Sequence, residues 1–251
     1  MGDLNNTEAA REHLLPVADP VYRFRSFPIH ACDDDPAVRT RYRPFLLDDE
    51  ISSSDWVMKL ELATAAKMVE TEILSQGKDR LRVLVLYGSL RSRSYSKLLA
   101  YEASRILFRL GCDVRVYDLS GLPVKDDQQH DHPKVQELRA LSKWSDGHVW
   151  VSPEQHGNLT AVFKNQIDWI PLSTGSVNGG SQSFNVVNSL RILGRWIRMF
   201  TIPNQSSIPK AWTHFTDTDD PEFVKYTIIM RPYFDLFGDR FSEREEAKVA
   251  K

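Results

Sequence analysis

Cysteine is scarce in this chain of 251 residues, in which Cys32 and Cys112 are the only two. Their spacing matches neither a zinc site, nor a Cys-x-x-Cys redox pair, nor a disulfide framework. Cys112 stands beside a predicted strand and is expected to be a small buried apolar residue. The sequence therefore predicts no metal site, and this cysteine usage is typical of a reducing compartment, the cytoplasm.

Long apolar runs and an excess of one charge are also missing. No run approaches the length of a membrane span, and the N-terminus has no apolar core of a signal peptide. Lys and Arg together number 32 against 34 Asp and Glu, which gives a net charge of −2. This balance gives no electrostatic reason to expect nucleic acid or an anionic membrane as a partner. One large domain with extensions is expected, since 41% of the residues are hydrophobic.

The stretch 81–96 combines an apolar run, a glycine and a loop of hydroxyl and arginine side chains. The apolar run 81–87 predicts a strand, and the residues from Ser94 to Leu110 predict an amphipathic helix. The apolar positions of this helix are Leu98, Leu99, Ala103, Ile106, Leu107 and Leu110. The pattern therefore indicates a strand, a loop and a helix that begins at the loop.

A phosphate group would suit the start of that helix. The first N–H groups of a helix have no intrahelical partner, and the peptide dipoles place positive charge there. Ser89 and Ser94 add hydroxyl donors, Arg91 adds a guanidinium group, and Ser94 also suits the N-cap position. The loop has neither the three glycines of a dinucleotide fingerprint nor a Gly-Lys-Ser ending, which favours a mononucleotide. The alternative interpretation is a solvated basic turn.

The rest of the chain alternates strands and helices. Strands are predicted at 112–117, 148–151 and 199–202, and helices at 133–144, at 159–170 and after the segment 179–185. This alternation predicts an α/β fold with a parallel sheet covered on both faces. A last helix is predicted at 222–234.

Residues 1–78 are predicted to form a proline-rich N-terminal arm that includes a helix from 54 to 77. Its larger apolar residues imply that the arm packs on something, such as a neighbouring subunit. These residues are Tyr22, Phe24, Phe27, Tyr42 and Phe45.

Two further loops lie where a ligand is expected. The loop 152–158 follows the third predicted strand, and in an open α/β sheet it faces the same crevice as the loop 88–94. The helix after it carries Lys164 and Asp168 at a spacing typical of a surface ion pair. The segment 179–185 is rich in glycine, so that its backbone suits close approach to a planar ligand, and a simple loop is the alternative interpretation.

The motifs resemble those of one family. The segment Gly88-Ser89-Leu90-Arg91-Ser92-Arg93-Ser94 resembles the Gly-Ser-x-Arg-x-x-Ser phosphate loop of NADPH-dependent FMN reductases. Residues 152–157 and 164–169 resemble the second flavin loop and helix of that family. Longer similarities at 87–91, 166–172, 179–185, 193–196 and 202–207 point to its arsenical-resistance members, and the resemblance extends from about 22 to 241.

The resemblance implies a flavodoxin-like, doubly wound parallel sheet within 79–241, a charged tail at 242–251, a non-covalent FMN, NADPH as electron donor and a homotetramer. The implied FMN-phosphate residues are Ser89, Arg91 and Ser94, and Tyr95 and Ser96 are further implied cofactor-binding residues. Those beside the ring and ribityl chain are Pro153, Glu154, His156 and Gly157, and those closing over the ring are Gly180 and Ser181.

The resemblance also implies an oxidoreductase in which the flavin carries the hydride, so that no catalytic side chain is required. His156 titrates near neutrality as an acid or base would, but a role in shaping its loop is favoured. The implied electron acceptors are small molecules: flavin, quinones, azo compounds and oxygen, with oxidation of trivalent organoarsenicals. With two separated cysteines, the chain offers no thiolate cluster for arsenic(III).

One segment departs from the family. The family has a central apolar strand before the Gly-Gly-Ser segment, whereas residues 172–178 read Leu-Ser-Thr-Gly-Ser-Val-Asn and predict no strand. We therefore expect a sheet of four strands, with one family strand missing between Pro171 and Gly179, and Gly180 and Ser181 displaced from the flavin. Two alternatives stay open: an FMN-binding electron carrier without NADPH turnover, and a truncated, non-catalytic family member.

Overall fold

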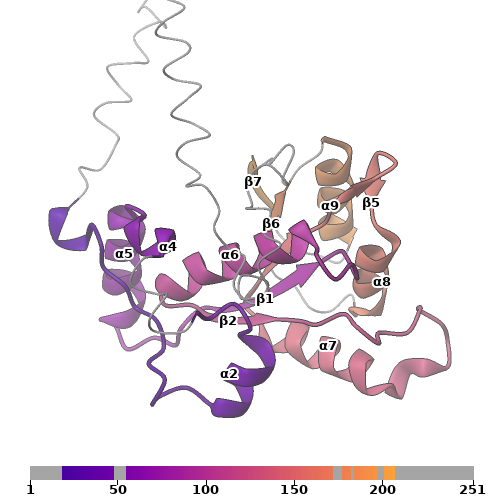
Figure 1. Ribbon diagram of the computed structural model, residues 1–251, viewed down its shortest axis with the longest axis horizontal. Coiled ribbons are helices and arrows are strands. Elements are labelled where there is room, and N and C mark those ends of the chain that lie inside the picture. Colours follow the sequence, from indigo (N-terminus) through magenta and orange to yellow (C-terminus); the bar gives the residue numbers. More distant parts are fainter. Residues whose placement is uncertain (1–18, 48–54, 172–176, 182–183, 197–200, 207–251) are drawn as a thin grey trace, which may run out of the picture.

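The computed structural model describes residues 19–47, 55–171, 177–181, 184–196 and 201–206. Five parallel strands form one sheet in the order β2-β1-β3-β6-β7 (Figure 1). Their bounds are β1 Arg82–Tyr87, β2 Asp113–Val116, β3 Gly147–Val151, β6 Val177–Ser181 and β7 Thr201–Ser206. This is the flavodoxin-like order, in which the first strand lies between the second and third. The predicted fold class is confirmed.

Helices connect the strands across both faces of the sheet. They are α6 Tyr95–Arg109, α7 Pro133–Trp144, α8 Ala161–Trp169 and α9 Phe184–Trp196. The chain moves from β1 to β2 on one side and returns past β1 to β3, so right-handed connections place α6 and α7 on opposite faces. Leu84, Val85 and Leu86 in β1 are fully buried, as expected for a parallel strand covered on both sides.

Helix α6 buries different residues from those predicted. Ser94 caps it as predicted, but the stripe of buried residues that faces the sheet is Ser96, Ala100, Ser104 and Phe108. The predicted apolar positions are only half-buried. Small side chains at 96, 100 and 104 let the helix approach the sheet closely.

The opposite side of α6 is covered by the N-terminal arm. Glu102, Arg105 and Arg109 are buried there, and Arg109 Nη1 donates to the carbonyl oxygens of Val57 and, at 2.8 Å, of Leu60. The apolar periodicity missed this second buried face because its residues are charged.

Helix α7 and the end of α6 match their predictions. Val135, Leu138 and Leu141 are buried, and Trp144 packs half-buried against the same core. Gly111 follows α6 with a φ of 89°, in the left-handed region that favours glycine after a helix.

The expectation of a missing strand is wrong. Strand β6 occupies the place between β3 and β7, with Gly147 paired to Val177 and Trp150 to Gly180. An inner strand of a parallel sheet is fixed by backbone pairing on both edges, so a glycine-rich segment takes this place without an apolar pattern.

Strand β7 also extends beyond its predicted end at 202. It includes Pro203, which an edge strand tolerates because, within the described residues, one side of its backbone has no partner strand. The predicted helix at 222–234 and the tail at 242–251 lie outside the described residues.

The described part of the N-terminal arm is made of short helices. These are a 3₁₀ turn Pro20–Tyr22, α2 Pro36–Tyr42, α4 Trp56–Lys59, α5 Ala63–Val69 and a π-helical turn Glu70–Leu74. The single helix predicted over 54–77 is therefore wrong, because the chain turns out of helical conformation at Leu60, where ψ is 134°. Phe45 is fully buried in the core, whereas Phe24 is exposed.

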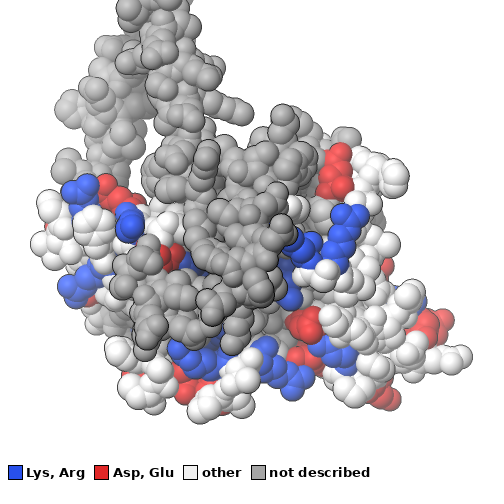
Figure 2. All heavy atoms as spheres, viewed as in Figure 1, with Lys and Arg blue, Asp and Glu red and all other residues white. Residues whose placement is uncertain are grey.

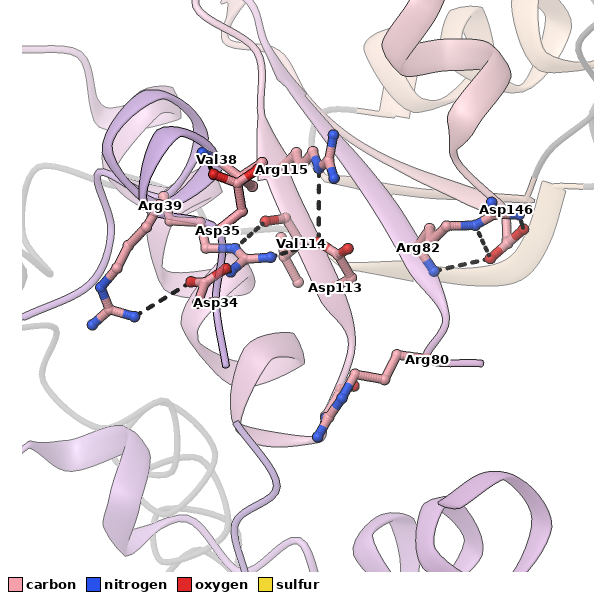
Figure 3. Close-up of polar contacts among 12 residues, drawn as sticks. Asp34, Asp35, Val38, Arg39, Arg80, Arg82, Asp113, Val114, Arg115 and Asp146 are labelled. Carbon is pink, nitrogen blue, oxygen red and sulfur yellow. Dashed lines mark hydrogen bonds and ion pairs between the residues drawn. The ribbon is translucent and has the colours of Figure 1, made fainter. Parts of the chain in front are cut away.

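Arg43 anchors this arm to the sheet, and Figure 3 shows where its partners Asp34, Asp113 and Val114 lie. Its guanidinium group is almost fully buried, forms ion pairs with Asp34 and, at 2.7 Å, with Asp113, and donates from Nε to the carbonyl oxygen of Val114. Arg39 lies 3.4 Å from the other oxygen of Asp34. The arm is thus held to β2 by charge-assisted hydrogen bonds.

His148 in β3 is a buried, neutral histidine. Trp150 Nε1 donates to Nδ1 over 3.2 Å, so the ring proton lies on Nε2, which is 3.4 Å from Ser142 Oγ. Burial lowers the pKa of His148 from 6.5 to about 4. The His148 imidazole therefore becomes protonated below pH 6.5 in the unfolded chain, but only near pH 4 in the folded chain.

Acidification is expected to remove about 3 kcal/mol of stability through His148, at about 1.36 kcal/mol per pH unit. This contribution is complete above pH 6.5 and is lost as the pH falls to about 4. Urea unfolding at neutral pH and at about pH 4 measures it. His148→Asn offers an acceptor to Trp150 but does not titrate, so this variant should lose about 3 kcal/mol less than the wild type on acidification. Equal losses in both proteins would contradict the assignment.

Candidate functional site

A pocket of about 750 Å³ opens at the carboxyl ends of β1 and β3. One wall is the loop after β1 with the first turn of α6, and the other is the loop after β3 with the first turn of α8. The predicted site residues that line it are Ser89, Arg91, Ser94, Tyr95, Ser96, Pro153 and His156. The structure therefore brings the two predicted loops together at one pocket, as the strand order requires.

Serine side chains shape the first turn of α6. Ser94 Oγ accepts from the N–H of Lys97 over 3.2 Å and lies 2.9 Å from Ser96 Oγ. Ser89 Oγ accepts from the N–H of Arg91 over 3.3 Å. Ser94 and Ser96 are almost fully buried, so their positions are fixed before any ligand enters.

The pocket has a positively charged rim. Arg91 and Arg93 both line it and are exposed, and Arg93 lies 5.9 Å from the ring centre of Tyr95. Figure 2 shows Lys and Arg side chains gathered over the N-terminal end of α6. The helix adds the positive end of its dipole, so this end of the pocket suits an anionic group such as a phosphate.

The second wall is a small hairpin. Strands β4 Glu154–Gln155 and β5 Asn158–Leu159 pair antiparallel, and His156 and Gly157 form the turn with φ values of 51° and 73°. Two successive positive φ values are those of a type I′ turn, the turn that matches strand twist. His156 thus has a backbone role in the hairpin, while Glu154 is exposed and, like Gly157, is not among the residues found to line the pocket.

Gly180 and Ser181 lie in β6, not in a loop. Gly180 pairs with Trp150 in β3 and with Gln205 in β7, and α9 begins at Phe184. The interpretation of 179–181 as a loop is therefore wrong. The predicted position of these residues over a ring stays a prediction.

Gly88 was predicted only as part of the phosphate-loop motif, and Thr160 was not predicted as a site residue. A Cβ atom on Gly88 would lie 2.9 Å from Thr160 Oγ1 and 3.0 Å from both Ser152 Oγ and Phe163 Cβ. Thr160 caps α8, accepting from the N–H of Phe163 over 3.3 Å. A Thr just before an apolar helical pattern is a cap signal that would have located it. The other unpredicted lining residues are Leu90, Arg93, Gln155, Leu159, Ala161 and Val162.

The predicted ion pair on α8 is confirmed, with Lys164 Nζ close to an oxygen of Asp168 and both side chains substantially exposed. Within the described ranges, no group of three or more His, Cys, Asp or Glu side chains is arranged to hold a metal ion. No helix in that part of the chain is both long enough and apolar enough to cross a bilayer.

Comparison with known proteins gives consistent matches. Residues 81–213 match the family model described as NADPH-dependent FMN reductase. A relative named "NADPH-dependent FMN reductase ArsH", from Rhizobium meliloti, is 52% identical over 195 residues, covering 67% of this chain and 81% of its own. A second relative, a 2-hydroxy-1,4-benzoquinone reductase of a Burkholderia species, is 33% identical over 119 residues, covering 45% and 63%.

Among solved structures, the flavoenzyme FerB of Paracoccus denitrificans, an NAD(P)H:(acceptor) oxidoreductase, has a TM-score of 0.46 and 18% identity. The match covers 63% of this chain and 96% of FerB.

Proposed function

Because this chain belongs to the NADPH-dependent FMN reductase family, we propose that its pocket binds FMN and that it is an oxidoreductase carrying electrons from NADPH to a small-molecule acceptor. The observation that carries the proposal is the pocket at the carboxyl ends of β1 and β3, with Arg91 and the N-terminus of α6 at its rim. Its volume of about 750 Å³ lies within the range of roughly 300–1,000 Å³ typical of cofactor sites.

The residues present fit FMN at its phosphate end. Gly88 leaves no room for a side chain between the loop and α8. The loop after it and the first turn of α6 line the same pocket, where a phosphate can reach the N–H groups of that turn. We assign the phosphate to Ser89, Arg91 and Ser94, with Tyr95 and Ser96 as further cofactor-binding residues. The ring and ribityl chain are assigned to Pro153, Glu154, His156 and Gly157, with Gly180 and Ser181 beside the ring.

A bound FMN would supply the redox chemistry, which is hydride transfer from NADPH and electron transfer to the acceptor. The chain's own residues bind and orient the cofactor. His156 shapes the hairpin through its left-handed backbone, and no protein acid or base is required.

The proposed acceptors are flavin, quinones, azo compounds and oxygen, with trivalent organoarsenicals as substrates for oxidation. The cysteines do not supply a site for arsenic(III). Cys32 is exposed, whereas Cys112 is buried and its burial raises the thiol pKa to about 11, so that it is no thiolate at neutral pH. An arsenical would therefore meet the protein only at the flavin. A homotetramer in the cytoplasm is the proposed state.

An absorbance spectrum of the purified protein, followed by addition of NADPH in air, tests this function. We expect a flavin spectrum and steady consumption of NADPH. A yellow protein that leaves NADPH unchanged would identify an electron carrier instead. A colourless protein that FMN cannot reconstitute would identify a non-catalytic family member, although the four-stranded sheet that suggested this alternative is not what the structure shows.

Arg91→Ala is expected to weaken FMN binding about tenfold, since one charge-assisted contact to phosphate contributes about 1.4 kcal/mol at an exposed site. Titration of the apoprotein with FMN, followed by flavin fluorescence, measures the affinity. Arg23→Ala is the control, because Arg23 is an exposed arginine on the arm with a weak pairing to Glu61 at 3.9 Å. Unchanged FMN affinity in Arg91→Ala would contradict the phosphate assignment.

A further inference from the structure

Thr160 lies where three elements of the site meet. Its Oγ1 donates to the carbonyl oxygen of Gly88 over 2.7 Å, and Thr160 Oγ1 also accepts from the N–H of Phe163 over 3.3 Å. Its own N–H donates to Ser152 Oγ over 3.4 Å. One residue thus connects the end of β1, the end of β3 and the start of α8.

Gly88 is held from both sides at this junction. Its N–H donates to the carbonyl oxygen of Val151 in β3 over 2.9 Å, while its carbonyl accepts from Thr160. The contact is close, since a Cβ on Gly88 would lie 2.9 Å from Thr160 Oγ1. The phosphate loop begins at the next residue, Ser89, so the position of Thr160 determines where that loop starts.

Thr160 also directly follows the hairpin of the other wall, since β5 ends at Leu159. The hydroxyl of Thr160 therefore joins the segment assigned to the FMN phosphate to the segment assigned to the ring. A ligand that contacts both walls is sensitive to their separation, because binding sites tolerate displacements of only about 0.5 Å.

We propose that Thr160 is a positioning residue of the cofactor site, whose hydroxyl sets the phosphate loop relative to the hairpin. The inference rests on the proposed function, since it requires that FMN occupies the pocket. A Thr that only capped α8 would stabilise the helix and leave FMN affinity unchanged. A positioning Thr lowers FMN affinity when its hydroxyl is removed.

Thr160→Val and Thr160→Ser separate these roles. Val keeps the shape but loses the hydroxyl, and Ser keeps the hydroxyl. We expect FMN to bind about tenfold more weakly to Thr160→Val and within about threefold of wild type to Thr160→Ser, measured by fluorescence titration of apoprotein with FMN.

Asp35→Ala is the matched control for capping. Asp35 caps α2, accepting from the N–H of Ala37 over 2.8 Å, and it lies on the arm, outside the pocket lining. Its loss should lower the melting temperature as a lost cap does, with FMN affinity within about twofold of wild type.

The outcomes separate the two proposals. Wild-type protein that binds no FMN overturns the proposed function. If the wild type binds FMN and Thr160→Val binds it equally well, the positioning role alone is overturned. The same holds if Thr160→Ser loses as much FMN affinity as Thr160→Val. If Thr160→Val does not fold, Thr160→Asn replaces it. Asn caps helices well but lacks the hydroxyl that donates to the carbonyl oxygen of Gly88, so weak FMN binding supports the role and normal binding overturns it.

Discussion

Gly88→Ala is expected to lower FMN affinity about 100-fold and to lower NADPH oxidation at limiting FMN with it. The added methyl group would lie within 3.0 Å of atoms from Thr160, Ser152 and Phe163, and Phe163 and Ser152 are buried. Overpacking by one methyl group costs about 1–3 kcal/mol. Here we expect the clash to move the phosphate loop away from the hairpin. Fluorescence titration of the apoprotein with FMN measures the effect.

Gly77→Ala is the matched control for this substitution. Gly77 has a φ of 66° but no neighbouring atom within 4 Å of an added Cβ, so the change strains the backbone by about 1 kcal/mol without a clash. It should lower stability slightly and leave FMN binding unchanged. Normal FMN affinity in Gly88→Ala would show that the close contact with Thr160 does not determine the shape of the site.

Arg43→Ala is expected to lower the free energy of unfolding by about 3–5 kcal/mol, the usual cost of breaking a buried ion pair. The guanidinium group is 1% exposed, and the carboxylate of Asp34 beside it is 3% exposed. Among the ion pairs of the described residues, removing Arg43 leaves Asp34 with its 3.4 Å contact to Arg39. Urea unfolding monitored by tryptophan fluorescence measures the loss.

Two further variants test the cause of this effect. Arg41→Ala, which removes an arginine that is 62% exposed and paired with Glu137, should cost less than about 1 kcal/mol. Asp34→Ala combined with Arg43→Ala should recover part of the lost free energy of unfolding, because the double variant has no buried Asp34 carboxylate without its arginine partner. A single Arg43→Ala variant as stable as Arg41→Ala would rule out the buried network as the anchor of the arm.

Local patterns predicted most of the fold. Strands β1 and β3 are continuous apolar runs, and α7 carries its buried face at helical spacing, so each is specified by residues close together in the sequence. Strand β6 was missed because its place depends on pairing with β3, as Gly147 does with Val177, and not on its own side chains. Helix α6 was assigned the wrong buried face because its close contact with the sheet uses Ser and Ala.

In the candidate site, too, the residues that are close together in the sequence were predicted, and those that depend on distant contacts were not. The phosphate loop was predicted because its serines and Arg91 are contiguous and lie between a strand and a helix. Thr160 was missed because its significance comes from a contact with Gly88, 72 positions away. The hairpin was predicted only as a loop, since a His in a left-handed conformation has no clear sequence signal.

Arg43 has a consequence for association between molecules. In the sheet that the described residues form, β2 is an edge strand. Asp113 and Tyr117 direct their N–H groups toward β1, so the carbonyl of the intervening Val114 points to the outer side of β2. An unpaired edge invites a strand from another chain, which is a common start of aggregation. Arg43 Nε donates a hydrogen bond to the Val114 carbonyl, and α2 contacts β2. The contacts that hold the arm to the sheet therefore also protect this edge against the addition of a strand from another molecule.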